Sequence, residues 1–203
     1  MEHEDIKKKV LTTGIRVGTS VKTKFMIPFI TQSSPEGFYL FDIDTTLNRI
    51  QTAGRFIKKF DIKRVIVYSG KLYAKTPIEK FCELTGAQMV LGRFMPGTLT
   101  NPSLPYYSEP QLLVVSDPQA DAQAVTEATN AGIPVIGIAN TDNITSKLDL
   151  VIPANNRGRK SLATIYWLLT QEILEGQDPK STETAKYGID DFETKVTDVE
   201  EEL

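Results

Sequence analysis

Two carboxylates follow an apolar run in the segment Phe41-Asp42-Ile43-Asp44-Thr45-Thr46-Leu47. Such a pair can perform phosphoryl chemistry, because one carboxylate attacks phosphorus, the second transfers a proton, and magnesium offsets the charge. The same residues have a simpler use at a junction between a strand and a helix, where acidic side chains accept hydrogen bonds from helix amides. The pattern leaves both interpretations open, and the structural one is favoured.

The pattern D-x-D-x-T-L resembles the first motif of the haloacid-dehalogenase phosphatases. Ser69 ends the next apolar run, as the second motif of that family would, and Lys71 follows closely. The later acidic pair is poorly matched by Ser116-Asp117-Pro118-Gln119-Ala120-Asp121. A metal site built from Asp117, Asp121, Asp142 and Asp149 is the related hypothesis, but capping and turn formation explain Asp117 and the turn around Asp142.

Basic residues form a second group that could do chemistry. The loop from Asn155 to Ser161 contains Asn155, Asn156, Arg157, Arg159 and Lys160, directly before a predicted helix whose free amides favour anions. We expect these five residues to bind RNA phosphates. Further cations that could engage a polyanion are Lys22, Lys24, Lys58, Lys59, Lys63, Arg64, Lys71 and Lys75. The alternative for residues 58–64 is a solvated helix end.

Several other chemistries lack the necessary residues. The chain has one cysteine, Cys82, and one histidine, His3, so a disulfide, a zinc cluster and a Ser-His-Asp triad are not expected. Neither G-x-G-x-x-G nor G-x-x-x-x-G-K follows a strand, so dinucleotide and P-loop binding have no motif. We expect no cofactor and no small-molecule substrate.

The net charge of -3 conceals an uneven distribution. From Ile189 to Leu203 seven acidic residues stand against Lys195 alone, so the rest of the chain keeps 22 basic and 19 acidic residues, a charge of +3. We predict one α/β domain at 1–176 and an acidic, flexible tail at 177–203. The apolar runs are too short for a membrane span, and the acidic N-terminus does not resemble a secretory signal, so a cytoplasmic protein without a membrane partner is expected.

Apolar runs alternate with helical patterns along the chain, which is typical of repeated βαβ units. Strands are predicted at 38–43, 64–69, 88–91, 112–116, 135–139 and 150–153. Helices are predicted near 5–12, from a cap at Asp44 or Thr45 to 60, from a capping box at Thr76 to Gly86, from Asp117 to Gly132, and over 161–175 up to Gly176. The segment 92–110 lacks periodicity, which favours a functional loop. Together these elements predict a single-domain, three-layer, doubly wound fold with a mainly parallel sheet.

The loops carry a more specific resemblance. Gly92-Arg93-Phe94-Met95-Pro96-Gly97-Thr98-Leu99-Thr100-Asn101-Pro102 is similar to the G-R-F-x-P-G-T-L-T-N-P segment of the second universal family of small-subunit ribosomal proteins, in its archaeal and eukaryotic, laminin-receptor-like form. Segments 114–121, 140–143, 152–161 and 165–169 follow in the order of that family. The resemblance extends over most of residues 10–175 and is more specific than the single D-x-D-x-T pattern.

The resemblance implies a flavodoxin-like sheet and a non-enzymatic structural component of the small ribosomal subunit. The partners it implies are small-subunit ribosomal RNA and neighbouring proteins such as small-subunit ribosomal protein five. We add Arg93, Thr98, Thr100 and Asn101 of the matched loop to the expected RNA-binding residues. Arg16 stands where relatives usually have histidine, so no role is carried over to it. A free adaptor protein that acts through the acidic tail is a third hypothesis.

Overall fold

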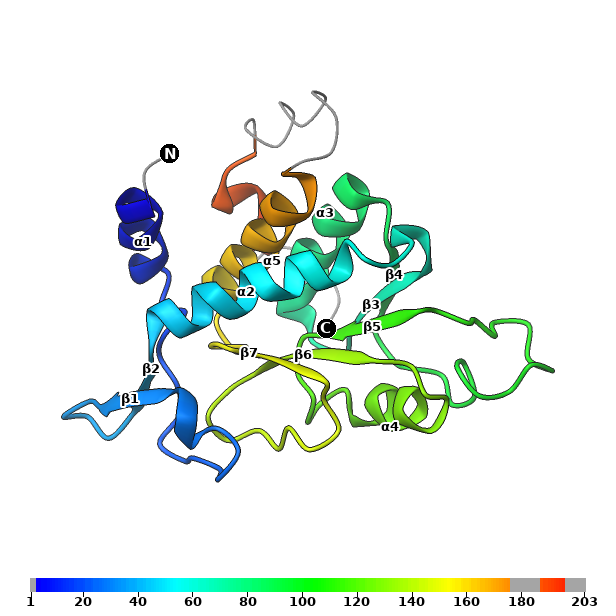
Figure 1. The fold of residues 1–203 in the computed structure, drawn as a ribbon, viewed down its shortest axis with the longest axis horizontal. Helices are drawn as coiled ribbons and strands as arrows, with labels where there is room; N and C mark the ends of the chain where they lie inside the picture. Colours follow the sequence, from blue (N-terminus) through cyan, green and yellow to red (C-terminus); the bar gives the residue numbers. More distant parts are fainter. Residues whose placement is uncertain (1–2, 176–186, 196–203) are drawn as a thin grey trace.

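The computed structural model describes residues 3–175 and 187–195, and its centre is a five-stranded parallel sheet (Figure 1). The strands are β3 (Val65–Ser69), β4 (Gln88–Leu91), β5 (Leu112–Val115), β6 (Val135–Ala139) and β7 (Leu150–Pro153). Their order is β4-β3-β5-β6-β7. Counted from β3, this is the order 2-1-3-4-5 of flavodoxin-like proteins, with the reversal between β3 and β5. The predicted doubly wound class is confirmed.

The helices cover the two faces of the sheet unequally. Figure 1 shows α2 (Ile43–Ile57), α3 (Lys75–Thr85) and α5 (Arg159–Leu174) on one face, and α4 (Ala122–Asn130) on the other. The crossover from β4 to β5 contains no helix. The loop 92–110 takes its place, and Phe94 and Leu99 of this loop are buried in the same apolar cluster as Val125 of α4. A helix-free loop therefore completes the second hydrophobic layer.

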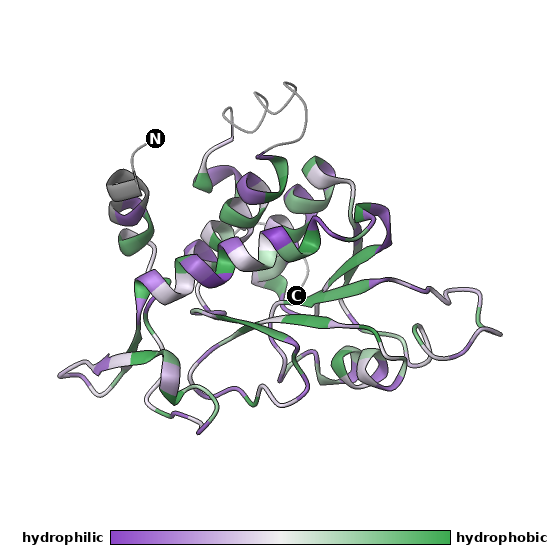
Figure 2. Cartoon of the chain, in the orientation of Figure 1, coloured by the Kyte–Doolittle hydropathy of each residue, from purple (hydrophilic) through white to green (hydrophobic). Residues whose placement is uncertain are grey.

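The central strands are buried along their whole length, which explains why their sequences are continuous apolar runs (Figure 2). The larger apolar cluster lies between the sheet and α2, α3 and α5, and contains the fully buried side chains of Phe81 and Tyr166. Cys82 belongs to this cluster, and burial raises the pKa of its thiol to about 12. The thiol therefore stays protonated at neutral pH and is a poor nucleophile.

The predicted strand at 38–43 does not join the parallel sheet. It forms β2 (Tyr39–Phe41), which pairs with β1 (Ile30–Ser33) in a separate antiparallel ribbon. Phe41 alone of the β2 residues is buried, and Phe38 is exposed. The apolar run was ambiguous, because a short ribbon with one inward residue has the same composition as a core strand.

The starts of α3 and α4 also differ from the prediction. The 3₁₀ turn Leu72–Ala74 leads directly into α3, so Ala74 occupies the cap position and the predicted capping box at Thr76 is not formed. The helix α4 begins at Ala122, five residues after the predicted start at Asp117. Residues 117–121 form a separate turn before it, in which the Asp121 amide donates to the Asp117 carbonyl at 2.9 Å. The ends of these two helices were predicted correctly: Gly86 and Gly132 adopt the left-handed φ values of 81° and 72°.

Part of the predicted tail packs against the domain. In the described segment 187–195, the 3₁₀ turn Ile189–Phe192 lies against α3 and α5 and buries Phe192 completely. The Trp167 indole donates to the Tyr187 carbonyl at 3.0 Å, and the Thr194 hydroxyl donates to the Tyr73 carbonyl at 3.0 Å. A flexible tail therefore does not describe these nine residues. The remainder of 177–203, with Gly176, lies outside the described residues.

The last helix, α5, begins two residues before its predicted start at Ser161, with Gly158 at the cap position. The helix predicted near 5–12 is confirmed as α1, which spans His3–Thr12 and so begins two residues earlier. No helix in residues 3–175 or 187–195 is long and apolar enough to cross a membrane.

Candidate nucleic-acid interface

The loops that follow the parallel strands meet at one edge of the sheet, because the carboxyl ends of parallel strands share an edge. These loops are 70–73 after β3, the start of 92–110 after β4, 117–121 after β5, 140–144 after β6 and 154–160 after β7. The N-terminal segment 14–24 joins them, since the Asn155 amide donates to the Ile15 carbonyl at 2.8 Å. We call this region the carboxyl edge.

Asn155 shapes the basic loop rather than facing outward. Its side-chain carbonyl accepts hydrogen bonds from the amides of Arg157 (3.0 Å) and Gly158 (3.3 Å), and its side-chain amide donates to the Gly14 carbonyl at 3.2 Å. The Ser161 hydroxyl donates to the Asn155 main-chain carbonyl at 2.6 Å. These bonds fix the start of α5 and the positions of the cations beside it.

Asn156 is fully buried, and this burial is incompatible with the RNA contact expected from the sequence. Its side-chain amide donates to the Ile138 carbonyl and to Oδ1 of Asn143, both at 3.1 Å. Its main-chain carbonyl accepts from Nζ of Lys71 at 3.1 Å. Asn156 therefore ties the loop after β7 to the end of β6 and to the loop after β3.

The cations of this loop lie at the surface. The Arg157 side chain is 57% exposed and forms an ion pair with Asp142, in which Nη2 lies 2.5 Å from Oδ2. Lys160 is exposed and Arg159 is half-buried, both in the first turn of α5. All three cations are thus placed where an anion can approach.

Lys22 and Lys24 lie on the same edge, although they are far from Arg157 in the sequence. Between them, Thr23 donates its amide to the Thr141 carbonyl and its hydroxyl to the Asn143 carbonyl, each at 2.9 Å. Lys22 also lies over the Tyr39 ring, with Nζ 4.6 Å from the centroid. Five of the exposed or half-buried cations at the carboxyl edge lie in these two segments, and we call them the edge cations: Lys22, Lys24, Arg157, Arg159 and Lys160.

The loop 92–110 starts at the carboxyl edge and then leaves it. Arg93 lies near that start, beside Gly92, whose amide donates to the Ser69 carbonyl at 3.3 Å, whereas Thr98, Thr100 and Asn101 lie farther along the loop. The Glu127 carboxylate of α4 accepts hydrogen bonds from the amides of Gly97 (2.8 Å) and Leu99 (3.2 Å), so it holds this loop on the α4 face. The loop then extends to the end of the molecule opposite β1 and β2 (Figure 1). Thr98 is buried and its hydroxyl donates to the Met95 carbonyl, whereas Arg93, Thr100 and Asn101 are exposed.

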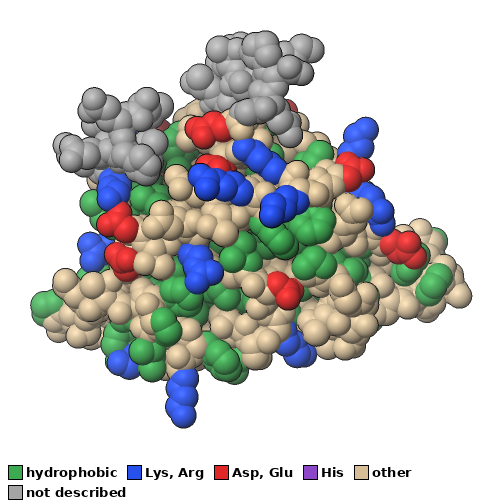
Figure 3. Space-filling view, viewed as in Figure 1, with side chains coloured by type: hydrophobic (Ala, Val, Ile, Leu, Met, Phe, Trp, Pro, Cys, Tyr) green, Lys and Arg blue, Asp and Glu red, His purple; other side chains and the backbone are tan. Residues whose placement is uncertain are grey.

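Basic side chains also lie along α2 on the face shown in Figure 3. They are engaged in contacts with the protein itself: Nε of Arg55 lies 3.3 Å from Oε1 of Glu172, and Nζ of Lys58 donates to the Glu175 carbonyl at 2.5 Å. Arg49 stacks over the Phe29 ring at 5.4 Å. These contacts favour the interpretation of this surface as a solvated helix face.

A buried ionic cluster at the reversal point between β3 and β5 was not predicted from the sequence. Nζ of Lys71 lies 2.5 Å from Oδ2 of Asp117, and Oδ1 of Asp117 accepts from Nδ2 of Asn143 at 3.2 Å. Asp121 accepts from the amides of Gly70 (2.9 Å) and Asp117 (3.2 Å). Burial raises the pKa of Asp121 to about 6. In the described part of the chain, no group of three or more His, Cys, Asp or Glu residues is placed to hold a metal ion.

The acidic pair at 42 and 44 stands apart from this cluster. Asp42 is the N-cap of α2, a position predicted for Asp44 or Thr45, and its carboxylate accepts from the Thr45 amide at 3.2 Å. The hydrogen bond from the Thr45 hydroxyl is the main cause of the lowered pKa of Asp42, with a smaller contribution from Arg16. Asp44 pairs with Lys7. Because β2 is outside the parallel sheet, the pair lacks the placement that the phosphatase interpretation requires.

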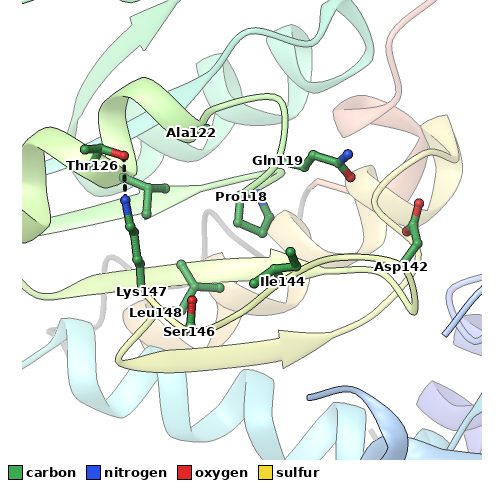
Figure 4. A pocket seen from close by; sticks show the side chains of 10 residues that line it. Pro118, Gln119, Ala122, Thr126, Asp142, Ile144, Ser146, Lys147 and Leu148 are labelled. Atoms are coloured by element: carbon green, nitrogen blue, oxygen red, sulfur yellow. Dashed lines mark hydrogen bonds between the residues drawn. The ribbon is translucent and has the colours of Figure 1, made fainter. Parts of the chain in front are cut away.

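Two hollows adjoin the carboxyl edge. A groove of about 290 Å³ lies between α4 and the loop after β6, and Figure 4 shows Pro118, Ala122, Ile144 and Leu148 around it. A wider, shallower hollow of about 690 Å³ lies at the reversal point and is lined by Lys71, Leu72, Tyr73, Asp117, Gln119 and Arg157. We call it the switch-point hollow.

The sheet order and this arrangement define an α/β domain of the doubly wound class, with a carboxyl edge rich in cations. The family model for ribosomal protein S2 matches residues 105–176. The small ribosomal subunit protein uS2 of Nitrosopumilus maritimus (strain SCM1) is 66% identical over 200 residues, covering 98% of this chain and 97% of the relative. The chain therefore belongs to the ribosomal protein S2 family, as its motifs predicted.

Other archaeal relatives agree. The small ribosomal subunit protein uS2 of Cenarchaeum symbiosum (strain A) is 56% identical over 195 residues, covering 96% of this chain and 94% of the relative. The protein of the same name from Thermofilum pendens (strain DSM 2475 / Hrk 5) is 46% identical over 188 residues, covering 92% and 87%. The archaeal-type interpretation is confirmed, and the chain is a ribosomal structural component of a family without enzymatic activity.

Proposed function

We propose that this chain is a component of the small ribosomal subunit in the cytoplasm, where the edge cations bind small-subunit ribosomal RNA. The names of its relatives support the assignment to the small subunit. One structural observation carries the RNA interface: two segments more than 100 positions apart are hydrogen-bonded together so that their cations share one edge. Folding thus brings Lys22 and Lys24 to the same edge as Arg157, although they are far apart in the sequence.

The edge cations would position the domain on the phosphate backbone rather than read bases. Lysine and arginine contacts to phosphates displace condensed counterions, so the affinity falls steeply as salt rises. Arg157 already holds a carboxylate, Asp142, at 2.5 Å. A phosphate can take the place of that carboxylate, because both groups accept paired hydrogen bonds from a guanidinium.

We propose that neighbouring small-subunit ribosomal proteins, such as protein five, dock on the ribbon of β1 and β2 together with the segment just before it. Apolar side chains there are unusually exposed: Val21 by 60%, Phe25 by 50%, Ile27 by 49% and Phe38 by 41%. Exposed apolar groups clustered in one region are typical of protein interfaces. This end adjoins Lys22 and Lys24, so the RNA and protein contacts would be contiguous.

The RNA interface is tested by charge reversal. The variant R157E/R159E/K160E is compared with K58E/K59E/K63E, which carries the same change in charge near the end of α2. Binding to small-subunit ribosomal RNA is measured between 50 and 200 mM salt, values within the range where such binding typically changes by orders of magnitude. We expect the first variant to lose affinity and salt dependence, with the logarithmic slope reduced by about 0.7–0.9 for each phosphate that is no longer neutralised. Equal losses in both variants would refute the assignment of the interface to the carboxyl edge.

Sedimentation of the native protein tests the function as a whole. Most copies are expected to travel with small subunits in a sucrose gradient, and a purified chain should turn over no phosphate ester in the presence of magnesium. Sedimentation as a free protein would instead favour the adaptor hypothesis.

A further inference from the structure

The switch-point hollow displays apolar surface in an unusual place. Leu72 and Tyr73 are 40% and 43% exposed, although both lie between the buried strand β3 and helix α3. The hollow of about 690 Å³ is within the range of roughly 300–1,000 Å³ that small-ligand sites occupy. Its position between β3 and β5 is the place where doubly wound sheets usually bind ligands.

The groups that would usually hold a phosphate there are already occupied. The Gly70 amide donates to Asp121, and the Lys71 ammonium is held between Asp117 and the Asn156 carbonyl. Two carboxylates of the protein thus stand beside the loop after β3. A ligand anchored first by its phosphate would meet negative charge instead of free donors.

The groups that remain at the surface are suited to a base. Tyr73 offers an aromatic ring, Leu72 an apolar neighbour and Gln119 an exposed amide, whose oxygen accepts a long hydrogen bond of 3.4 Å from Asn143. Bases stack on aromatic rings and hydrogen-bond to amides through their edges. Arg157 lines the hollow and is also an edge cation, so it can bind the phosphate next to a base held there.

We propose that the switch-point hollow binds the base of an unpaired RNA nucleotide, stacked on Tyr73 with its edge toward Gln119 and its phosphate on Arg157. This inference rests on the proposed function, because the edge cations supply the attraction that brings the strand to the hollow. An unpaired nucleotide is required, since bases within a duplex have their faces covered by stacking.

The test uses the full chain and an unstructured RNA decamer, (CA)₅. Its affinity is compared with that of an abasic decamer with the same charge, of the duplex with (UG)₅, and of AMP and CMP alone. The variants are Y73A, Y73W and the matched control Y106A, which changes a tyrosine that is 40% exposed on the loop 92–110. Binding of small-subunit ribosomal RNA is measured in parallel.

We expect the wild type to bind (CA)₅ about tenfold more tightly than the abasic decamer, and Y73A to lose most of this preference. Y73W should keep it and Y106A should not alter it. Folding is checked by the melting temperature, which Y73A should leave unchanged because Thr194 bonds to the Tyr73 backbone and not to its ring. Saturable binding of AMP or CMP that Y73A abolishes would also support a nucleotide site in the hollow. It would show that a free nucleotide, and not only a nucleotide within RNA, can occupy the site.

Two results would overturn the inference while leaving the proposed function intact. In one, ribosomal RNA binds in a salt-dependent manner but Y73A and the wild type do not differ on any probe. In the other, Y73A weakens binding of a neighbouring ribosomal protein and not of RNA, which makes the hollow a protein contact. Failure of the wild type to bind ribosomal RNA at all would refute the proposed function itself.

Discussion

The Gly70 amide donates a hydrogen bond to Oδ1 of Asp121 at 2.9 Å, and this bond links the end of β3 to the turn before α4. Asp121 is 1% exposed, so its charge is maintained within the protein by two amides and the nearby Lys71. Burial is the dominant influence, and it raises the pKa of this carboxyl from 3.8 to about 6. The protonation of Asp121, at the contact between the end of β3 and the turn before α4, therefore changes at mildly acidic pH.

We expect D121N to flatten the pH dependence of stability between pH 4 and 6. A pKa raised on folding means that the native state binds the proton more tightly, so the stabilisation is full below pH 4 and is lost as pH rises through 6. Each pKa unit corresponds to about 1.4 kcal/mol, and the pKa of Asp121 rises from 3.8 to about 6. Between pH 4 and pH 6 the free energy of unfolding of the wild type should therefore fall by up to about 3 kcal/mol more than that of D121N. Urea unfolding at pH 4, 5, 6 and 7 measures the difference. Parallel curves for the two proteins would contradict it.

Asp42 should affect the pH dependence of stability in the opposite direction to Asp121. Its pKa is lowered, mainly by the Thr45 hydroxyl, so the stabilisation it provides is present above its unfolded pKa and is lost as pH falls. D42A should cost about 1 kcal/mol at pH 7 through the lost cap of α2. D44A is the matched control, since Asp44 does not cap the helix. Comparable losses in both variants, measured by urea unfolding, would argue against capping as the role of Asp42.

Gly18→Ala should displace the segment that carries Lys22 and Lys24. An added Cβ would lie 2.4 Å from Cγ2 of Thr141 and 2.9 Å from the Tyr39 carbonyl oxygen, which is backbone and cannot rotate away. We expect a loss of stability of about 1–3 kcal/mol and weaker RNA binding without any change in charge. S20A, two positions along on an exposed residue, is the control. RNA affinity equal to that of the wild type would show that this segment is not part of the interface.

Phe192→Ala should destabilise the domain by about 3–5 kcal/mol, because the side chain is fully buried between α3 and α5. Trp167 is the single tryptophan and bonds to the Tyr187 carbonyl, so its fluorescence reports release of the segment. D190A, on the exposed side of the same turn, should alter neither property. A red-shifted spectrum without a loss of stability would indicate that the segment attaches without supporting the core.

The sequence predicted the secondary structure correctly where a local pattern was compatible with only one type of element. Val65–Ser69, Leu112–Val115 and Val135–Ala139 are continuous apolar runs, and only a strand buried on both faces suits them. The three-layer class and the sheet strands followed from these runs. The strand Tyr39–Phe41 was wrongly assigned to the parallel sheet. It pairs with Ile30–Ser33, and this pairing depends on tertiary packing that cannot be predicted from the composition of the strand.

The interface was predicted less completely for a related reason. Asn155 and Asn156 lie in a basic loop, and an amide there has the same sequence signature whether it faces RNA or holds the loop together. Burial decides between the two, and burial depends on Ile138 and Asn143 from another part of the chain. The convergence of Lys22 with Arg157 was likewise invisible until the fold joined their segments.

The position of Phe192 in the sequence, after every strand and helix that it covers, has a consequence for synthesis. Proteins emerge from the ribosome with the N-terminus first, so the parallel sheet is complete before the side chain that closes its largest apolar layer becomes available. Until that moment the apolar surface of α3 and α5 that Phe192 covers is exposed on the nascent chain. A premature stop codon between α5 and Phe192 would therefore yield a product with every strand of the sheet present but with this apolar surface uncovered.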